Sequence, residues 1–103
     1  MMTLPDCFGC AVRLTDERLA HILQHPEMLG FEHAIADALS APDEVRLSRS
    51  DAEVRLFFRH YGHTPVGAKW LCVVVKFRDD DAFIVTAYLT DQPNPGEWLW
   101  PKP

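Results

Sequence analysis

The chain has 103 residues, 48% of them hydrophobic, and a formal net charge of −5. This length fits one domain with a single modest core, and the apolar content is too high for a disordered tail. No apolar run approaches the roughly 20 residues of a membrane-spanning helix. The acidic balance disfavours the basic surface that nucleic-acid binding usually needs. We therefore expect a single globular domain over residues 1–103.

Residues 1–11 show no periodic pattern and are predicted to be an irregular lead-in. They contain Cys7 and Cys10, and they include neither a basic region nor a signal-peptide core. The three cysteines cannot all pair with one another, and we expect every thiol to stay reduced, with Cys72 half-buried in a strand and inert. This cysteine usage fits a reducing compartment, so the expected location is the cytoplasm.

Two helices are predicted after the lead-in. Thr15 is a suitable N-cap for the first helix, and the acidic residues that follow favour the positive end of the helix dipole. Pro26 pushes His25 away from helical angles, so the first helix should end there. The second helix should run from about Phe31 to Leu39, and Pro42 stops it.

After Pro42 the apolar period changes from helical to two, which predicts strands. Four strands are expected, at Val45–Arg49, Glu53–Tyr61, Lys69–Arg78 and Ala82–Thr90. Residues 12–90 form the core of the domain, and residues 91–103 form a tail rich in proline and tryptophan. The predicted fold is α+β, with two N-terminal helices packed on one face of a four-stranded antiparallel meander.

Alternation divides the strand side chains into two faces. The face expected to pack on the helices is almost wholly apolar: Val54, Leu56, Phe58, Leu71, Val73, Val75, Phe77, Phe83, Val85, Ala87 and Leu89. The opposite face mixes rings, cations and hydroxyls: Arg55, Phe57, Arg59, Tyr61, Trp70, Cys72, Val74, Lys76, Ile84, Thr86, Tyr88 and Thr90.

Rings and cations on one sheet face are typical of RNA binding, because rings stack on bases and cations meet phosphates. The candidate RNA-binding residues are Arg55, Phe57, Tyr61 and Trp70. The acidic residues fall in the Asp79–Asp81 turn and on the helices, so this face can stay cationic in an acidic protein. The alternative is a face that the tail covers.

The two short helices, the segment "HILQHPE" at residues 21–27 and a meander ending in "FIVTAYLT" resemble the barnase–EndoU–colicin–RelE superfamily of small ribonucleases, in its phage- and toxin-associated branch. The resemblance covers residues from about Val12 to Thr90, and its motifs are short. It implies a RelE- or barnase-like two-layer fold. It also implies a toxin-type endoribonuclease, a hydrolase that cleaves RNA by attack of the 2′-hydroxyl on the adjacent phosphate, with no metal or cofactor.

This chemistry needs a base, an acid and cations that hold the charged phosphorane. Carried over by the resemblance, the catalytic candidates are His21 or His25, Arg59 with Arg55 or Lys76, and Thr86 or Tyr88. His21 points away from the apolar stripe of its helix and His25 lies nearer the stripe's border, which favours His25 for reaching the sheet. The resemblance does not separate the two, and either can be an ordinary surface histidine.

The partners that the resemblance implies are RNA, as tRNA or ribosome-associated mRNA, and an antitoxin or immunity protein. DNA and membranes are not expected. The alternative function is a non-catalytic protein- or RNA-binding module that keeps the same fold. Expression separates the two, because an active toxin arrests its host cell.

Two zinc-binding hypotheses have less support in the sequence than the acid–base role of the histidines. His21 and His25 have the spacing of a helical zinc pair, but the glutamate of that motif is missing. A four-ligand site could combine two closely spaced pairs, Cys7 with Cys10 and His60 with His63. About fifty residues separate these pairs, against the roughly 12–15 of a zinc finger. No metal is therefore expected.

Overall fold

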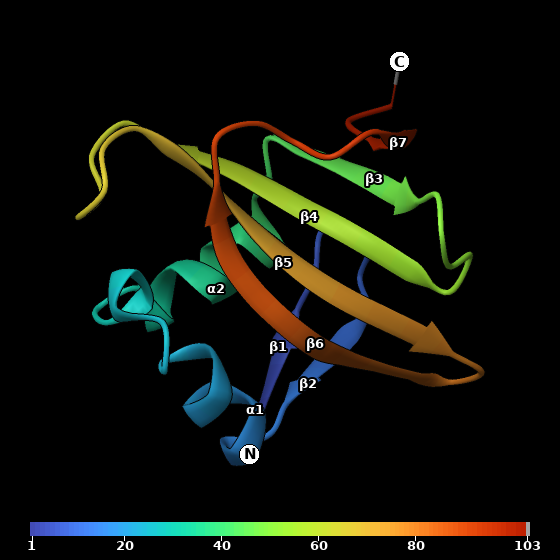
Figure 1. Cartoon of the computed structure of the whole chain (residues 1–103). Coiled ribbons are helices and arrows are strands. Elements are labelled where there is room, and N and C mark those ends of the chain that lie inside the picture. The colour runs from blue at the N-terminus through green and yellow to red at the C-terminus, as the bar shows by residue number, and fades with distance from the viewer. Residues whose placement is uncertain (103) are drawn as a thin grey trace.

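The computed structural model describes residues 1–102 as seven strands, two α-helices and one 3₁₀-helix. In chain order they are β1 (Met2–Pro5), β2 (Ala11–Leu14), α1 (Asp16–Ile22), η1 (Pro26–Met28), α2 (Glu32–Ser40), β3 (Glu44–Ser48), β4 (Val54–Tyr61), β5 (Lys69–Arg78), β6 (Asp81–Thr90) and β7 (Gly96–Trp100). All seven strands belong to one sheet with the order β1-β2-β6-β5-β4-β3-β7 (Figure 1).

The predicted fold class is wrong. The four expected strands do form an antiparallel meander, β3 to β6. Three further strands extend it, and β2 runs parallel to β6, so the sheet is seven-stranded and mixed. The lead-in contains β1 and the tail contains β7. Strands of four or five residues are too short to show an alternation in the sequence.

Both predicted helices are confirmed. The Thr15 hydroxyl caps α1 by accepting a hydrogen bond from the Arg18 N–H at 3.1 Å. The helix ends at Ile22, and Pro26 begins the short η1 helix, which the sequence did not predict. Helix α2 agrees with its predicted range to within one residue at each end.

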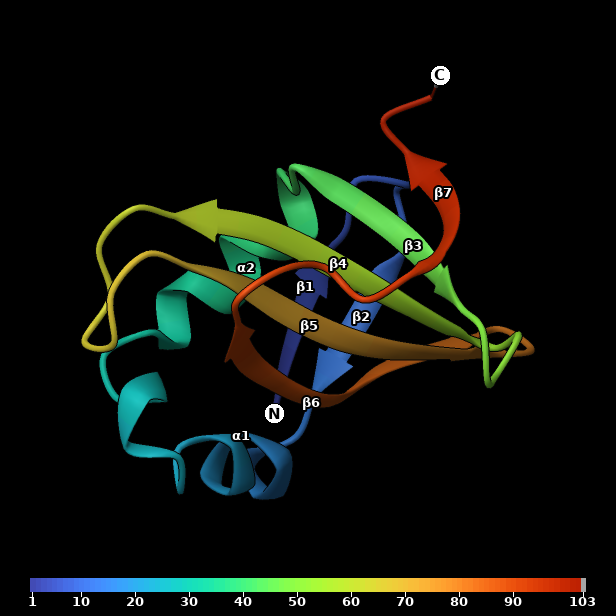
Figure 2. The ribbon, with the colours of Figure 1, turned by 45° about the horizontal axis from the view of Figure 1, so that its top comes forward.

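The sheet curls around its main core. Helices α1 and η1 pack against β6, and α2 packs against β5, β4 and β1. The β1–β2 hairpin passes behind β4 and β5 in both views (Figures 1 and 2). The tip of this hairpin reaches β4 and β7 on the same face of the sheet, where the Phe8 ring lies 6.1 Å from Phe57 and 5.7 Å from Trp100, measured between centroids. The core therefore lies between the concave sheet face, which we call the helix side, and the hairpin and helices.

The junction between β2 and β6 is narrow. Arg13 and Phe83 are the one residue pair in register between these two strands within residues 1–102. The Arg13 guanidinium lies 5.6 Å from the centre of the Phe83 ring and forms an ion pair with Asp81 at 2.6 Å. The Arg13 side chain thus joins β2 to the start of β6.

The predicted faces of β4 are reversed. Phe57 pairs with Val73 and is fully buried in the main core, whereas Phe58 pairs with Cys72 on the opposite, helix-free face. Three apolar residues in a row, 56–58, leave the phase of the alternation undetermined. The sequence therefore could not decide which side of β4 faces the helices.

A β-bulge also divides β6. The β5–β6 register shifts between Val74, which pairs with Thr86, and Val75, which pairs with Ile84. Val85 is the extra residue, so Ile84 enters the main core in place of Phe83. Beyond the bulge, Ala87 and Leu89 face the core as predicted.

The helix-free face carries a second, smaller core. Leu56 is 8% exposed, and Phe58 and Cys72 are fully buried, although no helix lies on this side. Residues 91–95, which we call the C-terminal strap, cross this face from the end of β6 to β7 (Figure 2). The alternative in which the tail covers this face is the one found. No helix within residues 1–102 is long and apolar enough to cross a membrane.

Candidate functional site

The catalytic candidates on the sheet lie on two faces. Arg59 pairs with Leu71 on the helix side. The other three lie on the helix-free face: Lys76, Thr86 and Tyr88. The prediction that all four point to one side is therefore wrong, and the reversed phase of β4 is the reason.

The two helix histidines lie away from both groups. His21 is exposed in the last turn of α1, where it lines a hollow formed by side chains of that helix and by Gln24 just after it. His25 is exposed at the start of η1. Both elements pack on β6 from the helix side, so neither histidine shares a face with Lys76 or Tyr88.

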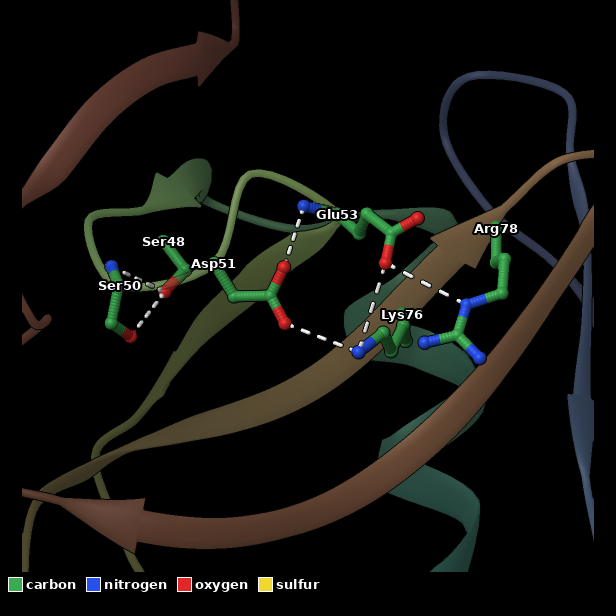
Figure 3. A network of polar contacts seen from close by, with 6 residues as sticks. All are labelled: Ser48, Ser50, Asp51, Glu53, Lys76 and Arg78. Atoms are coloured by element: carbon green, nitrogen blue, oxygen red, sulfur yellow. Dashed lines mark hydrogen bonds and ion pairs between the residues drawn. The ribbon is translucent and has the colours of Figure 1, made fainter.

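Lys76 is held by carboxylates. Its ammonium lies 3.2 Å from the Asp51 carboxylate and 3.7 Å from that of Glu53, which also meets Arg78 at 3.6 Å (Figure 3). The pKa of Asp51 lies below its ordinary value because its carboxylate accepts hydrogen bonds from the Glu53 N–H and from Lys76. The positive charge of Lys76 is thus neutralised within the chain.

The two arginines of β4 are also engaged. The Arg55 guanidinium lies 4.9 Å from the ring centre of Phe8 and 4.3 Å from that of Phe77. Arg59 donates a hydrogen bond to the Ala41 carbonyl and lies 5.9 Å from the ring centre of Tyr61. Aromatic faces and a backbone carbonyl therefore hold these cations against the protein.

The aromatic rings predicted to stack on RNA bases also lie on two different faces of the sheet. Phe57 is fully buried, and Tyr61 packs edge-on against Phe31 at 5.5 Å, both on the helix side. Trp70 lies on the helix-free face, edge-on to His60 at 5.1 Å. The four candidate RNA-binding residues therefore form no common surface.

Tyr88 is half-buried beneath the C-terminal strap. Burial, with the neighbouring Cys72 as a second cause, raises the pKa of its hydroxyl to about 12, although a hydrogen bond with Asn94 of the strap acts in the opposite direction. At neutral pH this phenol is therefore protonated.

The zinc hypotheses have no support in the described chain. Within residues 1–102, no group of three or more histidine, cysteine, aspartate or glutamate side chains lies close enough to hold a metal ion. Cys7 and Cys10 flank the tip of the β1–β2 hairpin. All three cysteines are free, and burial, with Asp6 as a second cause, raises the pKa of the Cys7 thiol to about 11.

The structure does bring together a group of residues that the sequence did not connect. The start of β2 and the β5–β6 turn enclose a hollow of about 260 Å³, lined by Cys10, Ala11, Phe77, Asp79, Asp80, Asp81 and Ala82. Its carbon surface comes from Phe77 and the two alanines, and three consecutive aspartates border it. We call it the acidic hollow. The sequence showed the aspartates, but Cys10 and Ala11 of the lining come from the segment predicted to be irregular.

Comparison of the chain with protein-family models, with curated proteins and with solved structures finds no match in any of the three. The resemblance to the barnase–EndoU–colicin–RelE superfamily therefore stays untested. Function is inferred from the residues themselves.

Proposed function

We propose that this chain is a non-catalytic binding module that recognises a basic protein. The observation that carries the proposal is the acidic hollow, in which an apolar surface is bordered by Asp79, Asp80 and Asp81. A lysine or arginine side chain has the matching character, because its methylene stem packs on carbon and its charged head binds carboxylates. Phe77 would receive the stem, and Asp79 and Asp80 the charge.

The charge distribution supports the same partner class. Five cations of the sheet are paired with carboxylates of the chain itself: Arg13 with Asp81, Arg46 with Glu44, Lys69 with Asp91, and Lys76 and Arg78 with Glu53. The net charge of −5 leaves the chain with an excess of carboxylates over cations. An acidic surface attracts a basic partner and raises the rate of encounter.

The binding module has better support than the ribonuclease. A ribonuclease of the expected kind needs its proton-transfer groups and its cations around one phosphate. Here Arg59 and Lys76 lie on opposite faces. The proposal includes a cytoplasmic location, which three free thiols favour.

Titration of the ¹⁵N-labelled protein with a tetralysine peptide tests the proposal. We expect amide shifts confined to residues 10–11 and 77–82, and their loss in the Asp79→Asn/Asp80→Asn variant. Asparagine tolerates the positive φ of 54° at residue 79, so the turn is kept. The matched control is Glu17→Gln/Asp37→Asn, which removes the same charge from exposed positions on α1 and α2.

Equal weakening in both variants would mean attraction to net charge alone and would contradict a site at the hollow. A second assay incubates the protein with total RNA in EDTA. Cleavage that falls by on the order of 10²-fold on His25→Ala or Arg59→Ala, the usual loss for an acid–base or charge-stabilising group, would restore the ribonuclease.

A further inference from the structure

One of the three aspartates at the acidic hollow already binds a cation. Asp81 faces Arg13 of β2, whose Nε donates to one carboxylate oxygen at 2.9 Å and whose Nη2 donates to the other at 2.6 Å. Within residues 1–102, neither Asp79 nor Asp80 takes part in an ion pair. The hollow therefore offers two unpaired carboxylates and a third that is occupied by a guanidinium of the chain itself.

The Arg13 side chain shows how a guanidinium fits this edge of the hollow. It meets both oxygens of Asp81 at once, and such two-point contacts are stronger and more directional than a single hydrogen bond. Its charged head also lies 5.6 Å from the ring centre of Phe83, which adds a cation–π contact. The hydrogen bonds from Arg13 are the main reason that the pKa of Asp81 lies below its ordinary value, so this carboxylate is charged at neutral pH.

The ion pair between Arg13 and Asp81 is open to water. Its two side chains are 37% and 49% exposed, whereas those of the Arg46–Glu44 pair are 24% and 8% exposed. An exposed ion pair contributes little to stability, because water and salt screen it. The backbone of β2 is held separately, through four residue pairs with β1. The Arg13 side chain can therefore leave Asp81 while its strand stays in place.

Within residues 1–102 no other cation forms an ion pair with Asp81. Arg78 stands across from it in the β5–β6 ladder, but the Arg78 guanidinium lies 3.6 Å from the Glu53 carboxylate. Lys76 lies beside the same carboxylate, at 3.7 Å. Release of Arg13 would thus leave Asp81 without an ion-pair partner. A cation from outside would then meet three open carboxylates at the hollow instead of two.

We propose that Arg13 is an internal competitor of the basic partner, and that an arginine of this partner displaces it from Asp81. The inference rests on the proposed function, since it concerns the same hollow. A guanidinium of the partner can reproduce both hydrogen bonds to Asp81, whereas the ammonium of a lysine is a point charge that cannot match this fork. The anchoring residue of the partner is therefore an arginine.

Internal competition sets both the affinity and the selectivity of the hollow. While Arg13 occupies Asp81 the site is only partly available, and the apparent affinity falls in proportion to the available fraction. A lysine binds through Asp79 and Asp80 alone, because it cannot replace the two hydrogen bonds that Arg13 would give up. An arginine replaces them one for one. The resident ion pair thus favours one kind of basic side chain over the other.

Titration of the ¹⁵N-labelled chain with a tetraarginine peptide tests the inference. Arg13→Met should bind the peptide about two- to fivefold more tightly than the unmodified chain, the range expected when one exposed ion pair no longer competes. A gain of affinity cannot come from damage to the fold, which would weaken binding. The matched control is Lys69→Met, which frees Asp91 and changes the net charge equally, at the opposite end of β5 from the hollow. It should leave the affinity unchanged.

The Arg13 Nε–H signal of the unmodified chain gives a second readout, which decides the case in which Arg13→Met fails to fold. Saturation with tetraarginine should move this signal towards its position in a solvated arginine, whereas saturation with tetralysine should leave it in place. A signal that tetraarginine does not move would overturn the inference. Equal affinities of the Arg13 and Lys69 variants would overturn it as well.

The inference and the proposed function fail in different ways. Amide shifts at residues 10–11 and 77–82 that leave the Arg13 signal unchanged would preserve the binding site and contradict the displacement. Absence of amide shifts with both peptides would contradict the binding site itself, and the displacement with it.

Discussion

Phe58 and Cys72 lie opposite each other on β4 and β5, on the sheet face that carries no helix, and both side chains are fully buried. The C-terminal strap is the segment that crosses this face. Its backbone is held at Asn94, whose carbonyl accepts from Arg46 at 3.5 Å, and at Gln92, whose carbonyl accepts from Thr90 at 3.2 Å. The strap is therefore held against the helix-free face by hydrogen bonds to its backbone.

Phe58→Ala should destabilise the protein strongly. Removal of a fully buried phenylalanine leaves a cavity and typically costs about 3–5 kcal/mol of the free energy of unfolding. Urea denaturation measures the loss. Phe83→Ala is the control and should cost less, because that ring is half-buried beside Arg13. A Phe58 variant as stable as the Phe83 variant would show that the strap does not close a core.

Gly96→Ala should disrupt the docking of β7. A Cβ at this position would overlap the backbone carbonyl oxygen of Leu47 on β3, which cannot move without breaking the ladder. We expect a clear fall in the midpoint of thermal unfolding and faster amide exchange in residues 96–100. Gly62→Ala is the matched control, since no atom lies within 4 Å of an added Cβ there. Equal effects of the two changes would contradict the close contact.

The thiols of Cys7 and Cys72 should be inert in the folded protein at neutral pH. Burial raises the pKa of Cys7 to about 11 and that of Cys72 to about 12, so almost no reactive thiolate is present. A thiol reagent should modify them only after denaturation. Rapid modification of Cys72 in the native protein would contradict its burial.

The same groups make stability fall at alkaline pH. The ordinary pKa of a cysteine is 9.0, so above that pH the unfolded chain loses thiol protons that the folded chain retains. The unfolded state then binds fewer protons, and the free energy of unfolding decreases from about pH 9 towards pH 12. Urea denaturation across this range measures the slope. Cys7→Ser/Cys72→Ala should flatten it, and an unchanged slope would assign the effect to other groups such as Tyr88.

Lys76→Met should raise the pKa of Asp51, because the hydrogen bond from the ammonium to the carboxylate is lost while that from the Glu53 N–H remains. The pKa of Asp51 should therefore move only part of the way back. An NMR titration of the carboxyl carbon measures it. Lys69→Met removes a lysine that pairs with Asp91 and should leave Asp51 unchanged. A shift of Asp51 in both variants would indicate a general charge effect.

The sequence predicted a helix or strand accurately where the element was long or where a capping residue marked its end. Thr15 marked the start of α1, and the range of β5, Lys69–Arg78, was predicted to the residue. The β1, β2 and β7 strands were missed because each is only four or five residues long, and β7 in addition pairs with the distant strand β3. Four or five residues carry too little alternation to reveal such a partner.

The candidate site depended on which side chains of each strand face the helices, and the sequence predicted this orientation least well. Phe57 and Phe58 are both fully buried, one in each core, so hydrophobicity could not say which faces the helices. The bulge at Val85 reversed half of β6 without any glycine to mark it. Because the phase of β4 was reversed, Arg59 and Lys76 were assigned to one surface, and no local pattern in the sequence could have separated them.

The narrow parallel junction between β2 and β6 has a consequence for how the chain folds. Arg13 and Asp81 are separated by 68 positions in the sequence, so this contact closes a long loop. The β5–β6 hairpin is local and can form early, whereas the N-terminal hairpin, although synthesised first, must wait for β6 before it can join the sheet. Such non-local pairing slows folding relative to a helical bundle of similar size. During synthesis the apolar sides of the N-terminal hairpin and of both helices therefore stay uncovered until β5 and β6 have left the ribosome.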